Sequence, residues 1–266
     1  YNSYRNSYHK PLISLNHQWQ INSKSSLSTS LYVSLGRGSG FSGQGNTEFS
    51  PYSYTSWRGA YKGTLYDTFR RSDGTFDYAA IEEINRTSEY GSALIAARSN
   101  NSHDWYGLLS TYTTKIGQYL DFYGGIDYRF YKGVHRNEIS DLFGGTYYLD
   151  SERGNVDVKN NIHAADPNWR YQKLGVGDVV FRDYDGFVMQ EGGFFQLEYN
   201  KDRLAAFVAG SLSNTGYWRY DRFYYDKEHA KSKTVNFLGF TAKGGANYNI
   251  TDNLSLIHIS EPTRRS

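Results

Sequence analysis

The stretch Leu27-Ser28-Thr29-Ser30-Leu31-Tyr32-Val33-Ser34-Leu35 decides the fold class, because its side chains alternate in character. The odd positions are mostly apolar and the even positions mostly polar, which is the period of a strand with one covered face. The segment before it alternates in the same way, with Ile13 and Leu15 on one side and Asn16 on the other. Because residues 22–26 between them have a polar turn composition, the two segments predict a β-hairpin.

The same alternation recurs along the chain and predicts about seven strands. Residues 119–132 alternate over fourteen positions, which is long for a strand of a soluble sheet. The expected strands are 13–21, 27–35, 104–114, 119–132, a segment ending at 199, a segment beginning at 204, and 238–250.

The composition of the 266 residues supports a β protein and excludes several classes. Aromatic residues make up 17% of the chain, with 26 tyrosines, and there are 27 glycines; this favours strands over helices. The absence of cysteine excludes disulfides and thiolate catalysis. A net charge of +2 argues against nucleic acid as a partner. No apolar run approaches the ~18 residues of a membrane-spanning helix.

The connections between the expected strands alternate in length. Those at 22–26, 115–118, 200–203 and 251–253 are tight, whereas those at 36–103, 133–180 and 221–232 are long. A transmembrane β-barrel has this asymmetry, with short periplasmic turns and long extracellular loops. We therefore predict an all-β fold, part of a transmembrane antiparallel β-barrel, with a short helix over 77–90 in one loop.

Aromatic side chains fit the same frame. Trp19, Phe122, Tyr199 and Tyr248 lie on the apolar side of their strands, within a few residues of a short turn. Aromatic girdles of membrane barrels occur at such positions. We predict that these four residues form the periplasmic-side girdle, in contact with outer-membrane lipid.

No constellation in the sequence predicts catalysis, a metal or a cofactor. The G-x-G-x-x-G match at 38–43 is followed by Phe49-Ser50-Pro51-Tyr52, which cannot form the helix of a nucleotide site, so we expect a flexible loop there. Asp183-Tyr184-Asp185-Gly186 begins like a calcium loop but has no closing Glu. Trp57 and Trp169 are the aromatic candidates for ligand contact in the extracellular loops.

Several blocks resemble the barrel region of TonB-dependent outer-membrane receptors. They are Lys10-Pro11-Leu12-Ile13-Ser14-Leu15-Asn16-His17, Ser102-His103-Asp104-Trp105-Tyr106-Gly107-Leu108, Gly124-Gly125-Ile126-Asp127-Tyr128-Arg129-Phe130-Tyr131, Asp141-Leu142-Phe143-Gly144-Gly145, Gly192-Gly193-Phe194-Phe195-Gln196-Leu197-Glu198-Tyr199 and Lys243-Gly244-Gly245-Ala246-Asn247-Tyr248. Together they extend over most of residues 1–253. They are strand and loop motifs, so they indicate the family rather than its cargo.

The resemblance implies a 22-stranded barrel with an N-terminal plug in the Gram-negative outer membrane. It also implies active uptake of a scarce nutrient (a metal chelate, a cofactor or a glycan), driven by the TonB complex acting through the plug. A surface lipoprotein is a further expected partner. Two other functions remain open: a passive porin-type barrel, and a secreted β-rich glycan-binding protein. None of these three expected functions is that of an enzyme.

Residues 254–264, Leu-Ser-Leu-Ile-His-Ile-Ser-Glu-Pro-Thr-Arg, resemble a translated sequencing adapter. We therefore divide the chain into 1–253, an internal segment of the barrel, and 254–266, a non-native tail. The alternative is a genuine eighth strand that begins at Leu254.

Overall fold

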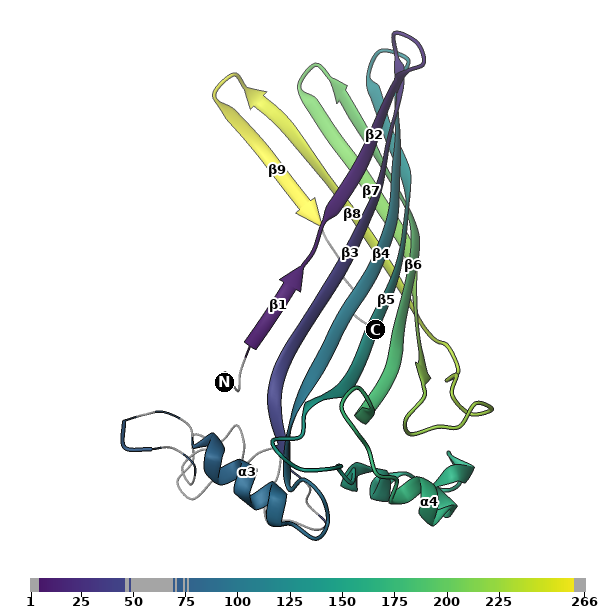
Figure 1. Cartoon of the computed structure of the whole chain (residues 1–266). Coiled ribbons are helices and arrows are strands. Elements are labelled where there is room, and N and C mark those ends of the chain that lie inside the picture. The colour runs from purple at the N-terminus through teal and green to yellow at the C-terminus, as the bar shows by residue number, and fades with distance from the viewer. Residues whose placement is uncertain are drawn as a thin grey trace.

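The computed structural model describes residues 5–45, 48, 69, 71–73, 75 and 77–260, which form one tall, curved antiparallel sheet (Figure 1). From β3 onward each strand pairs with the next one in the chain, while β1 and β2 both pair with β3. The two sheet edges do not pair with each other within these residues, so the described sheet is open. The strands are β1 (Arg5–His9), β2 (Leu12–Gln20), β3 (Ser25–Gly45), β4 (Leu94–Ile116), β5 (Leu120–Asp141), β6 (Val179–Lys201), β7 (Leu204–Asp221), β8 (Val235–Thr251) and β9 (Leu254–Ser260).

All four tight connections lie at one end of the sheet, which we call the turn end (Figure 1). They are turns at 21–24, 117–119, 202–203 and 252–253, so the predicted tight turns are confirmed. The turn at 252–253 leads into β9, which pairs with β8. The non-native origin of residues 254–266 stays a prediction.

The long connections lie at the opposite end, the loop end, but they are shorter than predicted. β3 continues to Gly45 and β4 begins at Leu94, while β5 runs to Asp141 and β6 begins at Val179. The apolar alternation ends about halfway along these strands, whereas backbone pairing continues through polar and glycine residues. Side-chain periodicity therefore underestimates strand length here.

The helices of the described residues lie at the loop end (Figure 1). They are α3 (Tyr78–Thr87), η1 (Ser151–Asn155), η2 (Ile162–Ala165) and α4 (Pro167–Arg170). The predicted helix over 77–90 is confirmed by α3, whose first turn is capped by Asp77 accepting from the Ala80 N–H at 3.1 Å. Among the described helices, none is long and apolar enough to cross a membrane.

Strand register collects the apolar residues of all strands on one side, which we call the apolar face. Leu31 lies opposite Leu108, and Leu108 lies opposite Tyr128. In β5 this apolar belt runs over 120–130, which is roughly 25 Å for a strand tilted by about 40°. No protein covers the belt in the described structure: Ile126 is 55% exposed and Leu212 63%.

Between the belt and the loop end, the apolar face becomes charged. Cross-strand ion pairs join Arg37 to Asp104 at 2.7 Å and Arg98 to Glu138 at 2.6 Å. The most enclosed acids of this region, Asp183 and Asp185, are both held by Arg222, at 2.7 and 3.1 Å, and Lys132 adds a contact to Asp185 at 3.3 Å. The apolar belt therefore ends sharply on its loop-end side.

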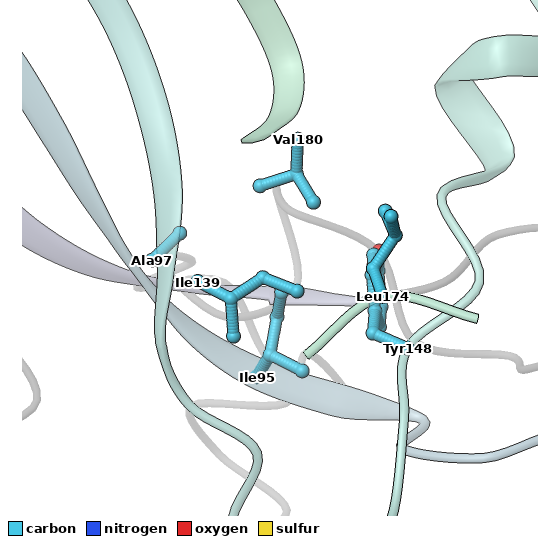
Figure 2. Packing of buried hydrophobic residues seen from close by; sticks show 6 residues of the cluster. All are labelled: Ile95, Ala97, Ile139, Tyr148, Leu174 and Val180. Carbon is cyan, nitrogen blue, oxygen red and sulfur yellow. The ribbon is translucent and has the colours of Figure 1, made fainter. Parts of the chain in front are cut away.

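Two small hydrophobic cores fix the loop-end connections to opposite faces of the sheet. Figure 2 shows the first, on the polar face, where Tyr148 and Leu174 of the 142–178 connection pack against strand residues. The second lies at the apolar face, where Ile81 of α3 packs against Leu94 and Phe143. The full first cluster is Ile95, Ala97, Ile139, Tyr148, Leu174 and Val180.

Candidate ligand-binding site

A cavity of about 880 Å³ lies on the polar face at the loop end. Five strands and two connections contribute to it, because the 142–178 connection folds over this face. The lining side chains are mostly uncharged hydrogen-bonding groups. They include Asn6 and Tyr8 of β1, Gln44 of β3, Ser99 and Asn101 of β4, Asn137 of β5, Arg182 of β6, and Glu152 and Tyr224 from the connections.

Arg182 ties three strands together in the cavity wall. Its Nη2 donates to Ser99 Oγ at 2.7 Å and its Nε donates to Asn137 Oδ1 at 3.2 Å. Asn101 extends the network, with its Nδ2 donating to Ser99 Oγ at 3.1 Å and its Oδ1 lying 2.9 Å from His135 Nδ1. The guanidinium therefore already has neutral partners, and the wall is a hydrogen-bonded polar surface.

We call the part of the 142–178 connection that lines the cavity, Ser151 and Glu152, the roof. The roof is attached to β6 through the buried carboxyl of Asp150. Asp150 is 2% exposed, and its two oxygens accept from the N–H groups of Phe181, at 2.8 Å, and Glu152, at 3.1 Å. Phe181 has a φ of 67°, a left-handed conformation that costs energy in a non-glycine residue. Burial raises the pKa of Asp150 to about 6.

A second acid, Glu152, takes part in the roof. The hydroxyl of Tyr224 donates to Glu152 Oε1. Burial, together with this carboxylate, raises the pKa of Tyr224 well above its ordinary value. Tyr224 thus stays a neutral donor, and the connection after β7 is joined to the one after β5.

Aromatic rings on the polar face occupy the space beside glycines of the neighbouring strand. A Cβ on Gly38 would collide with the ring of Tyr8, and one on Gly36 would collide with the ring of His103. Gly38 is the first glycine of the G-x-G-x-x-G match. The expectation of a flexible loop there is wrong, because these residues form part of β3 and the glycines make room for rings.

Of the two aromatic candidates for ligand contact, Trp169 lies in the described residues, and it does not line the cavity. Trp57 lies outside the described residues. Trp169 lies in α4, half-buried, with the guanidinium of Arg153 4.8 Å from the centre of its ring. One of its faces is therefore used for packing within its own connection.

The four residues predicted to form a girdle are placed by the strand register, and their role as a girdle stays a prediction. Trp19, Phe122, Tyr199 and Tyr248 are on the apolar face near the turn end. Their contact with lipid stays a prediction. A second aromatic group, which sequence reasoning missed, lies at the loop-end limit of the belt. The rings of Phe187 and Trp218 stack with centroids 5.2 Å apart, and the ring centroids of Phe130 and Trp218 are 6.2 Å apart.

The described residues include no group of three or more His, Cys, Asp or Glu side chains that could hold a metal ion. The possible start of a calcium loop at 183–186 is part of β6, and its acids pair with Arg222. Sequence reasoning also missed the cavity residues, because most of them lie in 36–103, 133–180 and 221–232, which it assigned to loops. Extending the two-residue period through Asn137 and Arg182 would have placed both on the polar face.

No protein-family profile and no curated protein matches this sequence. Among solved structures, the chain is similar to the ferric citrate transporter FecA in the unliganded form, with 10% identity and a TM-score of 0.52, over 95% of this chain and 27% of that one. It is also similar to the ferric-catecholate import receptor Fiu from E. coli K12 in a closed form, with 10% identity and a TM-score of 0.45, over 96% of this chain and 33% of that one.

The chain thus spans about a quarter of the length of FecA. The sequence prediction of an all-β, antiparallel barrel-type sheet is confirmed, and the count of 22 strands stays a prediction. The likeness to FecA shows the fold alone: this chain has the fold of part of an antiparallel β-barrel.

Proposed function

We propose that this chain is part of the barrel wall of a TonB-dependent outer-membrane receptor that actively takes up a scarce nutrient. The observation that carries the proposal is the uncovered apolar belt, about as tall as the hydrocarbon core spanned by outer-membrane barrels. A soluble protein would not expose such a continuous face, with Leu31 48% and Phe240 54% exposed. The belt is therefore matched to lipid.

The difference between the two faces supports transport rather than a purely structural role. The apolar face would contact lipid, while the polar face carries the ligand-sized cavity at the loop end. Pockets for small ligands measure about 300–1,000 Å³, and this cavity is within that range. In the proposed orientation the loop end is extracellular, so the cavity faces incoming ligand and the turn end faces the periplasm.

The energy source is proposed from the resemblance to TonB-dependent receptors. Coupling to the TonB complex would take place through a plug region, and a surface lipoprotein is a further proposed partner. The nutrient would be a metal chelate, a cofactor or a glycan.

The test uses the complete receptor gene, expressed in the outer membrane of a strain without its own uptake systems. Uptake of labelled ferric citrate, cobalamin and neutral oligosaccharides is measured with TonB present and with TonB deleted. The proposal predicts uptake of at least one probe that disappears without TonB. Uptake that persists at the same rate without TonB would instead show a passive porin, and recovery of the receptor in the medium would show a secreted binding protein.

A further inference from the structure

We infer that the loop-end cavity binds a neutral oligosaccharide, an inference that rests on the proposed function and selects one of its three nutrient classes. Three independent properties of the cavity point to this ligand: its charge, a buried amide oxygen without a partner among the described residues, and an exposed aromatic ring beside Gly38.

The charge of the cavity argues against an anionic chelate. Among the described residues that line it, the charged side chains are Glu152 and Arg182, which have opposite signs. Both are already engaged, Glu152 by the hydroxyl of Tyr224 and Arg182 by Ser99 and Asn137. A chelate with several negative charges would meet one cationic side chain in the described lining, Arg182, and its charge is offset by that of Glu152. The lining therefore supplies no net positive charge to repay the desolvation of such an anion. A neutral ligand meets no such penalty.

The polar groups match a ligand rich in hydroxyls. Asparagine and glutamine amides each present donors and an acceptor, as a sugar hydroxyl does. Gln44 is 4% exposed and lines the cavity, and its Oε1 has no hydrogen-bond partner among the described residues. A buried acceptor without a partner loses the hydrogen bonds that water would give it, which destabilises the unliganded site. A hydroxyl of a bound sugar would satisfy this acceptor.

An aromatic platform completes the site. Tyr8 is 61% exposed, and one side of its ring lies against Gly38, where any Cβ would collide with it. The other side remains available for the apolar C–H face of a sugar ring, because aromatic rings combine an apolar body with a polar edge. Hydroxyl-binding amides beside an open ring favour a carbohydrate over a compact inorganic or carboxylate ligand.

The test measures binding of hexasaccharides to the purified full receptor by titration calorimetry. The neutral probes are maltohexaose, cellohexaose, xylohexaose and mannohexaose; hexagalacturonate and ferric citrate are the anionic ones. We expect one neutral probe to bind more tightly than either anionic probe. We expect Gln44→Ala and Tyr8→Ala each to weaken that binding about tenfold, and Tyr8→Phe to preserve it because the ring is kept.

The matched controls are Gln190→Ala and Tyr123→Ala, which remove the same side-chain types from the polar face outside the cavity. Both should bind as the wild type does. The inference is overturned if no neutral probe binds, if an anionic probe binds best, or if Gln44→Ala leaves the affinity unchanged. The last result would mean that water alone satisfies the amide. TonB-dependent uptake of ferric citrate would overturn the choice of a glycan while leaving the proposed transport function intact. Loss of all TonB-dependent uptake would overturn the transport function itself.

Discussion

Acidification is predicted to tighten the attachment of the cavity roof to the sheet, and Asp150 is the group responsible. Its carboxyl is 2% exposed and accepts hydrogen bonds from the backbone of Phe181 and Glu152. Burial raises its pKa to about 6, whereas an exposed Asp has a pKa of about 3.9. An acid whose pKa is higher in the folded state binds its proton more tightly there. The attachment therefore becomes more stable as pH falls through 6, and the gain levels off below about pH 4.

The size of the effect follows from the two pKa values. At pH 7.5 the carboxyl is ionised whether the roof is attached or open, so the pKa difference adds almost nothing. At pH 5 the attached form is mostly protonated while the open form is still mostly ionised, which favours attachment by about 1 kcal/mol. The opening equilibrium of the roof should therefore fall several-fold between these two pH values.

Hydrogen exchange of the η1 and Phe181 amides in the full receptor measures this opening. Each rate is divided by the intrinsic rate of an unstructured peptide at the same pH, which leaves the protection factor. Wild-type protection should increase several-fold from pH 7.5 to pH 5. Asp150→Asn, which cannot ionise, should show little change. An equal increase in both proteins would refute the assignment to Asp150, and a decrease in the wild type would refute the sign.

Three further predictions concern the sheet and its helix. Arg222→Met should lower the free energy of unfolding of the loop end by about 2–4 kcal/mol, because it leaves two enclosed carboxylates without their main partner; denaturant melts of the receptor would show a shift, and Arg222→Lys should recover part of it. Asp77→Ala should destabilise α3 through loss of its N-terminal cap, and faster proteolysis of the α3 connection would report it; unchanged cleavage contradicts a capping role. In receptor variants that each keep one tryptophan, the fluorescence of Trp19 should be quenched strongly by brominated lipids in proteoliposomes, whereas that of Trp105 on the polar face should not. Equal quenching contradicts the two-face assignment.

Much of the fold could be predicted from the sequence. Alternation over 27–35 and 119–132 shows which side of each strand is apolar, because successive side chains of a strand point to opposite faces. The alternating lengths of the connections indicate a barrel-type sheet, since turns and loops gather at opposite ends of a meander. The four girdle positions follow from the same two patterns.

The site, in contrast, could not be predicted from the sequence. Ser99 and Arg182 are far apart in the chain, and only the register of β4, β5 and β6 brings them within hydrogen-bonding distance. The strands also continue past the apolar belt, where alternation fades and composition resembles a loop. Polar and glycine residues there pair as strands because neighbouring strands already supply the partners.

The sequence by itself therefore determined the strand period, the apolar face and the division into turn end and loop end, because each depends on residues close together in the chain. Only the tertiary structure decided which side chains form the cavity and how its roof is attached. Contacts such as those of Asp150 with Phe181 depend on how a long connection folds back over the sheet, and no local pattern encodes that path.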